Sequence, residues 1–299
     1  MLKTRCFADK NYKSIYFNGK TMRIALDPAK PIQDLDYPEF YDIKLTNRCE
    51  GKCPYCYQNS KAGEEDIDAI SKLKQFLGSM SDNEKPFQIA YGGGEPTLHP
   101  QFHDIMKLTR ELGISPNYTT NGMNITDEII ETTKKYCEGI AVSCHPHLDY
   151  WWTSAAEKFI EEGVFTNFHN VISDKKSIDR FLEIYHSWKG KIKYFVVLPM
   201  MNMGRAKDQE FEPEYFFDKI EEMVNSGVDV SDIAFGANFF PYLKGKEYLK
   251  LSLYEPEIMS KYLDLTNGYL YKSSFDTGEP IGRIDKKEKV TLDDVRSVD

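Results

Sequence analysis

Apolar residues along the chain alternate between short strand-like runs and amphipathic helix-like runs. In the helix-like runs they recur at spacings of three and four, as at Phe102, Ile105, Met106 and Thr109, so one helical face is apolar. The same spacing returns in residues 216–224. The expected strands between such helices are residues 40–46, 87–91, 115–120, 139–144, 166–172, 193–199 and 232–237.

The junctions between these elements carry signals of their own. Glycine adopts the left-handed conformation that ends a helix, so a glycine followed at once by an apolar residue marks a helix-to-strand junction. Thr126 and Ser177 are candidate N-caps, because a hydroxyl there accepts a hydrogen bond from the first helical turn. Repeated β–α units imply parallel strands with right-handed crossovers, in a barrel or an open doubly wound sheet. The glycine junctions are Gly113–Ile114, Gly139–Ile140, Gly163–Val164 and Gly227–Val228.

Two terminal segments lie outside this β–α alternation. Near the N-terminus, Asn18-Gly19 separates two strand-like runs and predicts a hairpin. From about Gly268 onward the chain shows short strand-like runs and then a charged end. We expect this C-terminal segment to cover one side of the main domain.

The composition is that of a globular protein, since 41% of the 299 residues are hydrophobic and 28% are charged. No run approaches the roughly 20 apolar residues that a membrane helix needs. The N-terminus lacks an apolar signal core, so we expect a cytoplasmic protein. The formal net charge of −9 disfavours binding to DNA or long RNA, which are polyanions.

Three of the six cysteines, Cys49, Cys53 and Cys56, form a C-x3-C-x2-C segment directly after the first expected strand. Thiolates suit iron–sulfur clusters or zinc. A structural zinc site needs a fourth ligand, and no second C-x2-C or H-x3-H pair follows. Three thiolates on a cubane of about four irons leave one iron open to a small molecule. The pattern favours such a cluster, and a zinc loop with a distant fourth ligand is the alternative.

The cysteine spacing, with the aromatic Tyr55 just before the last cysteine, resembles the defining motif of the radical S-adenosylmethionine (radical SAM) superfamily. The resemblance implies that Cys49, Cys53 and Cys56 hold a [4Fe–4S] cluster. It further implies that the amino and carboxylate groups of S-adenosylmethionine (AdoMet) chelate the fourth iron, and that Tyr55 contacts the adenine region.

A glycine run, Gly92, Gly93 and Gly94, follows the second expected strand and leads into Glu95. The run lacks the spacing of a phosphate-binding loop, and alone it marks only a tight turn. Glycines also let backbone groups approach a ligand closely, and a carboxylate suits a protonated amine. The run resembles the GGEP motif of radical SAM proteins, which implies that these residues bind the methionine amine of AdoMet.

Further positions at the ends of later strands resemble AdoMet contacts of the same superfamily. Turn chemistry, core packing and a solvated charge are the alternatives for each of them. The positions are Thr120, Asn121 and Ser143 for the ribose or carboxylate, Asn170, Val171 and Leu198 for the adenine, and Arg205 for the carboxylate.

The fourth expected strand ends at Ser143, and Cys144, His145 and His147 follow closely. Many relatives carry an acidic residue after that serine. A thiol there is a candidate hydrogen-atom donor to a substrate radical, and either histidine is a candidate acid or base. For each we favour the alternative, which is packing for the thiol and turn formation for the histidines.

The resemblance spans residues 38–240 and implies an α/β fold, a partial (β/α)6 barrel of parallel strands like part of a TIM barrel. An N-terminal strand and hairpin extension (residues 1–37) would precede the radical SAM core barrel, and a C-terminal helix and tail (241–299) would follow it. No cysteine follows Cys144, so we expect a single cluster and none of the auxiliary clusters found in several peptide-modifying relatives.

The activity implied by the resemblance is reductive cleavage of AdoMet to methionine and a 5′-deoxyadenosyl radical, which abstracts a hydrogen atom from a substrate. A one-electron donor such as flavodoxin or ferredoxin would reduce the cluster. Our leading hypothesis for the substrate is a peptide or protein side chain. A nucleoside or other small metabolite, or a glycyl-radical enzyme to be activated, remains open. The alternative of another class is a non-catalytic zinc or iron–sulfur binding module.

Overall fold

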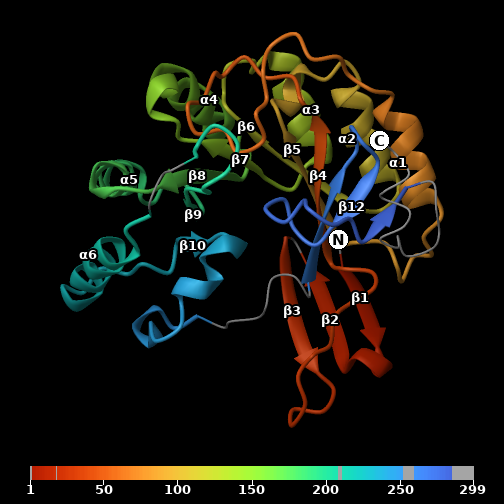
Figure 1. The fold of residues 1–299 in the computed structure, drawn as a ribbon, viewed down its shortest axis with the longest axis horizontal. Helices are drawn as coiled ribbons and strands as arrows, with labels where there is room; N and C mark the ends of the chain where they lie inside the picture. Colours follow the sequence, from red (N-terminus) through yellow and green to blue (C-terminus); the bar gives the residue numbers. More distant parts are fainter. Residues whose placement is uncertain (1, 18, 208–210, 252–258, 285–299) are drawn as a thin grey trace.

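The structure is a computed structural model that describes residues 2–17, 19–207, 211–251 and 259–284. A ten-stranded sheet forms its centre (Figure 1). Seven of the strands are parallel and lie side by side in chain order. They are β4 (Phe40–Thr46), β5 (Gln88–Gly93), β6 (Ser115–Thr120), β7 (Ile140–Ser143), β8 (Thr166–Ile172), β9 (Phe195–Pro199) and β10 (Ile233–Phe235).

One α-helix follows each of the first six parallel strands, and the helices form an arc outside the sheet (Figure 1). The expected partial (β/α)6 barrel is therefore confirmed. None of the helices among the described residues is both long and apolar enough to cross a membrane. The helices are α1 (Ala69–Gly78), α2 (Phe102–Glu111), α3 (Asp127–Tyr136), α4 (Asp149–Glu161), α5 (Lys175–Trp188) and α6 (Pro213–Asn225).

The C-terminal segment extends the sheet, whereas the sequence led us to expect a cover over the barrel. β11 (Ser260–Asp264) pairs in parallel with β4, and β12 (Tyr269–Tyr271) and β13 (Gly282–Arg283) follow in antiparallel order. Within the described residues β10 and β13 are the two edges of this sheet, so the barrel stays open between them. Residues 252–258 and 285–299, which hold part of the expected C-terminal helix and the charged end, lie outside the described residues.

Short 3-10 helices occupy several of the connections. Two of them follow β10 and lead toward β11, and two others begin directly after β5 and β7, at the end of the sheet where the candidate site lies. They are η1 (Ala8–Lys10), η2 (Pro96–Leu98), η3 (Pro146–Leu148), η4 (Ala237–Tyr242) and η5 (Glu247–Leu249).

Side chains along each parallel strand alternate between the helix layer and the barrel interior. On β4, Tyr41, Ile43 and Leu45 are buried in the main hydrophobic core, which lies between the sheet and the helices. Asp42 and Lys44, between them, face the interior instead. The core is thus apolar on the helix side, while the interior carries polar and charged side chains.

The N-terminal hairpin is confirmed and is part of a three-stranded antiparallel sheet. Its strands are β1 (Leu2–Phe7), β2 (Tyr12–Phe17) and β3 (Lys20–Ala25). Gly19 has a φ of 77°, which suits the two-residue turn. The sheet meets the barrel at the start of β4, where Glu39 accepts hydrogen bonds from Tyr12 and Arg23. The sequence predicted an N-terminal strand and a hairpin, but not the antiparallel pairing of β1 with β2.

Two of the expected junction signals need correction. Thr126 caps α3 as predicted, because its side chain accepts from Ile129 N, but Ser177 does not cap α5. Asp174 is the N-cap there, and Ser177 is the third helical residue of its capping box. Gly139 lacks the positive φ of the other junction glycines, and its role is close packing: a Cβ on it would lie 3.0 Å from the ring of Phe165.

Candidate functional site

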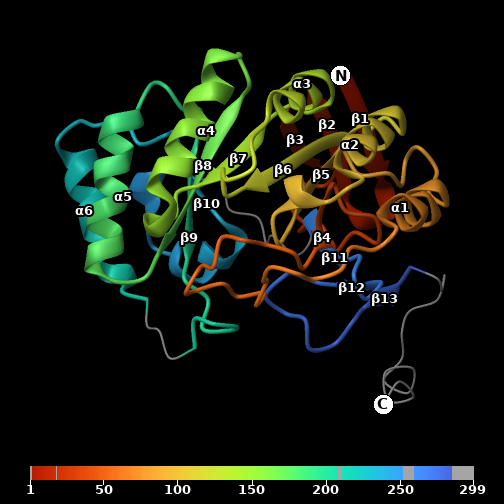
Figure 2. The ribbon, with the colours of Figure 1, turned by 90° about the horizontal axis from the view of Figure 1, so that it is seen from above.

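The three clustered cysteines lie in the loop after β4, at the carboxyl end of the parallel strands. The loop, orange in Figure 2, reaches the segment after β9, where Arg205 N donates to Cys56 O over 3.0 Å. Gly51 lies between two of the sulfurs, since a Cβ built on it would be 3.4 Å from Cys49 Sγ and 3.6 Å from Cys53 Sγ. The fold therefore gathers the thiols predicted to bind the cluster.

These thiols influence one another electrostatically. Burial, followed by the charges of Cys49 and Cys56, raises the pKa of the Cys53 thiol to about 12. Burial also raises the pKa of Cys49, against hydrogen bonds from Gly51 and Asn121. Among the described residues, no three Cys, His, Asp or Glu side chains are arranged to hold a single metal ion. Neighbouring thiolates repel one another, so each is stabilised by binding a positively charged metal ion. An iron–sulfur cubane provides a separate iron for each of the three thiolates.

The glycine run at the end of β5 packs directly on the start of the cysteine loop. Gly93 has a φ of 104°, and a Cβ on it would lie 2.6 Å from Thr46 O. A Cβ on Gly94 would lie 2.1 Å from Arg48 O. Gly94 N donates to Thr46 O over 2.7 Å, and Glu95 N donates to Arg48 O over 2.8 Å. Two amides of this motif therefore hold the cysteine loop in place.

Glu95 connects the glycine run to the end of β6. Its side chain is only 2% exposed, and Oε2 accepts from Asn121 N over 2.7 Å while Oε1 accepts from Thr97 Oγ1 over 2.7 Å. Burial raises the pKa of this carboxyl, against those hydrogen bonds. Asn121 continues the chain of contacts, since its Nδ2 donates to Cys49 Sγ over 3.7 Å. The two motifs are thus linked through the end of β6.

Two side chains from later segments hold the cysteine loop from outside. The Arg205 guanidinium donates to Cys53 O over 2.8 Å and to Ser60 O over 2.9 Å. His147 Nε2 lies 2.9 Å from Gly51 O, a hydrogen bond that only the ring nitrogen can donate. These contacts fix the backbone of the loop without occupying its sulfurs.

Tyr55 contacts the segment after β7 rather than open space. Its hydroxyl lies 2.9 Å from His145 Nδ1, and the two ring centroids are 5.6 Å apart. Burial, followed by the charges of His147 and His169, lowers the pKa of His145 to about 4. His145 is therefore neutral near pH 7 and acts here as a hydrogen-bond partner of Tyr55.

The interior ends of β7, β8 and β9 present a mixed polar and apolar surface. Ser143 lies opposite His169 in the register, and Val171 lies opposite Leu198. All four side chains are partly exposed. Burial lowers the pKa of His169 to about 4. Asn170 lies on the other face, toward the helices, and its Nδ2 has no hydrogen-bond partner among the described residues.

Comparison with known proteins assigns this site to a family. The family model of the Radical SAM superfamily matches residues 43–217, which is more than half of the chain. The chain belongs to the radical SAM superfamily. Members of this family bind a [4Fe–4S] cluster and AdoMet, and these are the cofactors of this enzyme.

The curated proteins similar to this chain include a cofactor-modifying protein and a maturase. A tungsten-containing aldehyde ferredoxin oxidoreductase cofactor-modifying protein of Pyrococcus furiosus is 34% identical over 94 residues, 30% of this chain and 25% of that protein. The mycofactocin maturase MftC of Mycobacterium tuberculosis is 29% identical over 97 residues, 32% of this chain and 24% of that protein. The matches thus span about a quarter of these curated relatives.

Two solved structures share the fold over most of this radical SAM chain. Streptococcus suis SuiB bound to S-adenosylmethionine has a TM-score of 0.65 and 17% identity, and the match covers 85% of this chain and 65% of that one. The protein anSMEcpe, with bound AdoMet and a Cp18Cys peptide, has a TM-score of 0.60 and 19% identity over 86% of this chain and 80% of that one.

Several residues expected to contact AdoMet make contacts within the protein. Arg205, expected to pair with the AdoMet carboxylate, donates to loop carbonyls, because the cysteine loop folds back onto the segment after β9. Thr120 Oγ1 accepts from Gly122 N, in the turn after β6. Asn170 does not face the interior, where the adenine was expected. Side chains alternate along β8, so Val171 lies on the interior face and Asn170 on the opposite one.

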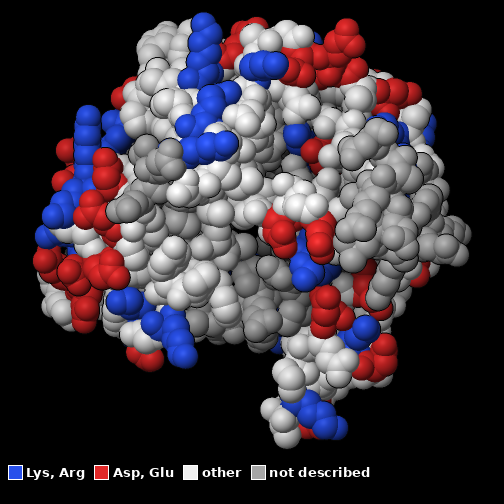
Figure 3. Space-filling view, in the orientation of Figure 1, with Lys and Arg blue, Asp and Glu red and all other residues white. Residues whose placement is uncertain are grey.

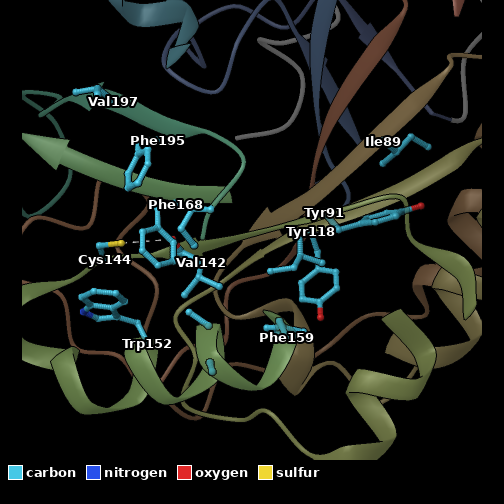
Figure 4. Close-up of a cluster of buried hydrophobic side chains, with 14 of the residues drawn as sticks. Ile89, Tyr91, Tyr118, Val142, Cys144, Trp152, Phe159, Phe168, Phe195 and Val197 are labelled. Atoms are coloured by element: carbon cyan, nitrogen blue, oxygen red, sulfur yellow. Dashed lines mark hydrogen bonds between the residues drawn. The ribbon is translucent and has the colours of Figure 1, made fainter. Parts of the chain in front are cut away.

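Cys144, the candidate hydrogen-atom donor, lies in the hydrophobic core of this radical SAM protein. Figure 4 shows it close to Phe168 and Trp152, between the sheet and α4. It is 7% exposed, and burial raises the pKa of its thiol well above the ordinary value. The packing agrees with the alternative of a small buried apolar residue.

The charged residues of the barrel interior were not predicted from the sequence. The Asp42 side chain has surface accessible to water, but it lies inside the barrel with protein around it. This burial raises the pKa of its carboxyl to about 7. Lys44 forms an ion pair with Asp264 of β11 over 3.1 Å. A charged residue at every second position of an otherwise apolar strand was the signal that could have identified them.

Proposed function

We propose that Cys49, Cys53 and Cys56 hold the [4Fe–4S] cluster of this radical SAM enzyme and that AdoMet lies over the interior ends of β5 to β9. The single observation that carries this proposal is the approach of the Cys49 and Cys53 sulfurs to Gly51, with Cys56 near enough to Cys53 to act on its charge, beside the glycine run that packs on the same loop. When bound, the reduced cluster supplies the electron that cleaves AdoMet and so produces the radical that abstracts hydrogen from the substrate.

The residues around the thiols fit such a cluster. All three sulfurs come from one loop whose backbone is held by Arg205, His147 and the Gly94 amide. Burial and then the neighbouring thiolates raise the pKa of Cys53, and the positive charge of iron would offset both effects. The chain's own contribution is therefore a rigid loop that presents three sulfurs and leaves further coordination to a ligand.

Other residues of the site would place AdoMet. Gly92 has open space around its Cα, so its backbone is the part of the glycine run that a methionine amine could approach. Ser143 offers a hydroxyl on the interior face, and the adjacent Val171 and Leu198 offer an apolar surface for the adenine. Tyr55, held by His145, would close the same region from the side of the cysteine loop.

We further propose that the substrate is a peptide or protein side chain that enters the open side of the barrel. Figure 3 shows a hollow at the centre of the face viewed along the barrel, with acidic side chains gathered on one side of it. Within the described residues β10 and β13 are the edges of the sheet, and an extended chain could pair with the backbone of such an edge. SuiB bound to its precursor peptide SuiA has the same fold, which supports the proposal. Asp42 offers an interior acceptor for a donor group of the substrate.

Anaerobic reconstitution tests the cofactor assignment. We expect about four irons and four sulfides per chain and dithionite-dependent release of 5′-deoxyadenosine. Cys53→Ala should abolish both, whereas Cys6→Ala, on the exposed N-terminal sheet, should change neither. One zinc per chain without AdoMet turnover would favour the non-catalytic binding module instead.

The substrate class is tested by deuterium transfer. Reconstituted enzyme is incubated with deuterated candidate peptides, or with deuterated nucleosides and pterins, and the label in 5′-deoxyadenosine is measured. Transfer from a peptide supports the proposal, and transfer only from a small molecule contradicts it. The electron donor is tested in the same assay, by replacing dithionite with reduced flavodoxin or ferredoxin.

A further inference from the structure

The sulfur of Cys49 is in a different environment from those of Cys53 and Cys56. Two donors reach it: Gly51 N at 3.4 Å and Asn121 Nδ2 at 3.7 Å. Among the described residues, Asn121 is the one side chain that donates a hydrogen bond to any of the three sulfurs. Because it comes from the end of β6, its approach to Cys49 is set by the fold and not by the cysteine loop itself.

Hydrogen bonds of its backbone and of its side chain fix the position of Asn121. Its backbone N donates to the buried carboxylate of Glu95 over 2.7 Å, and its Oδ1 accepts from Met123 N over 2.9 Å. With the oxygen engaged in the turn, the amide nitrogen must point toward Cys49. The residue is 7% exposed, so water does not compete strongly for that nitrogen.

Close packing surrounds the Asn121 side-chain amide. Gly51 packs against it, since a Cβ on Gly51 would lie 3.3 Å from Asn121 Nδ2. The following Gly122, with a φ of 83°, lets the turn pass α4, where a Cβ would lie 2.8 Å from Trp151 O. The turn is therefore built to bring one amide donor to one sulfur.

A hydrogen bond to a cluster-bound sulfur has a defined electrostatic effect. It withdraws negative charge from the thiolate, which stabilises the reduced, more negative form of the cluster relative to the oxidised form. The effect is stronger in a site shielded from water than on the surface. A donor at Cys49 thus makes the cluster easier to reduce.

We propose that Asn121 is a positioning residue that raises the reduction potential of the cluster by donating its Nδ2–H to the sulfur of Cys49. This inference rests on the proposed role of the three cysteines and replaces the AdoMet contact that the sequence had suggested for Asn121. It assigns to the turn after β6 the function of matching the cluster to its electron donor.

The test is a potentiometric titration of the reconstituted cluster, followed by electron paramagnetic resonance. Asn121→Asp keeps the oxygen that accepts from Met123 N but removes the donor to the sulfur, and Asn121→Ala removes both. We expect the midpoint potential to shift to more negative values in both variants, and further in Asn121→Asp because of the added carboxylate. Asn124→Ala, whose amide donates to Thr97 O and not to a sulfur, is the matched control and should titrate like the wild type.

The outcomes separate this inference from the cofactor assignment. A wild-type protein without a [4Fe–4S] signal contradicts the assignment itself. A full cluster with an unchanged potential in Asn121→Ala contradicts only the inference. If neither variant retains a cluster, the wild type labelled with 15N-asparagine decides: a hyperfine coupling between 15N and the reduced cluster, measured without AdoMet, supports the hydrogen bond, and its absence overturns it.

Discussion

The two halves of the barrel differ in how their carboxyl ends are built. At the ends of β4, β5 and β6, the backbone is tied together by hydrogen bonds from Gly94, Glu95 and Asn121 to their neighbours. At the ends of β8 and β9, the interior face instead presents the partly exposed side chains of Val171 and Leu198, which lie opposite each other in the register. The first half is thus held by backbone hydrogen bonds between neighbouring segments, whereas the second half offers side chains that a ligand could contact.

The largest effect should come from the first half, where the glycine run leaves no space. In Gly94→Ala, a Cβ would lie 2.1 Å from Arg48 O, so the cysteine loop must move. We expect a loss of stability on the order of 3 kcal/mol and almost complete loss of iron after reconstitution. Gly92→Ala is the control, because nothing lies within 4 Å of its Cβ position. Similar iron contents in the two variants would contradict this account of the motif.

Arg205 distinguishes loop support from ligand binding. Arg205→Leu loses the hydrogen bonds to Cys53 O and Ser60 O, each worth about 1.5–3 kcal/mol for a charged donor. We expect iron content to fall several-fold, while AdoMet affinity per remaining cluster stays unchanged. The measurement is iron analysis combined with AdoMet binding. Full iron content with weakened AdoMet binding would contradict this account and would support the contact between Arg205 and the AdoMet carboxylate that the sequence predicted.

Leu198 tests the second half. Leu198→Ala removes apolar surface next to Val171, and we expect AdoMet affinity to fall about five- to tenfold without loss of iron. Val196→Ala, one step deeper on the same interior face, should have a smaller effect. Equilibrium binding of AdoMet to the loaded enzyme measures both. Loss of iron in Leu198→Ala would mean that the two halves are not separable.

The smallest effect concerns the acid side of the stability profile. Burial lowers the pKa of His169 from 6.5 to about 4, so between these values the unfolded chain binds a proton that the folded chain does not. The free energy of unfolding therefore falls as the pH drops from 6.5 toward 4. In His169→Gln, the decrease between pH 7 and pH 5 should be smaller by about 1–2 kcal/mol.

Denaturant unfolding at several pH values checks this prediction. His186→Gln, on the exposed side of α5, serves as the control and should follow the wild type. An unchanged pH profile in His169→Gln would show that the pKa of His169 is not lowered in the folded protein.

The parallel core was predictable because its signals are local. Strand runs such as residues 115–120 and 166–172 coincide with β6 and β8, since alternating burial and a following helix leave a clear periodicity. The order of β11 beside β4 was not predictable, because a parallel pairing about 220 residues apart leaves no trace in either segment alone.

The site shows the same division. The spacing of the cysteines and the glycine run identified the chemistry. A motif does not show, however, with which atoms the side chains near it form hydrogen bonds. Asn121 and Arg205 were assigned to the ligand because their positions after strand ends resemble AdoMet contacts of the superfamily, whereas in the structure they donate to Cys49 Sγ and to loop carbonyls. Asn170 could have been excluded from strand alternation alone, by comparing it with the buried Phe168 and Ile172.

The pairing of β11 with β4 has a consequence for biosynthesis. During translation the three thiols leave the ribosome long before Ser260–Asp264 is made, and until then β4 exposes one edge of its backbone. Lys44, a few residues before the thiols, also lacks its partner Asp264 during that interval. In a nascent chain the cysteine loop therefore follows a strand that still lacks its neighbour β11. We expect insertion of iron and sulfide to be most efficient after β11 has been synthesised and has paired with β4.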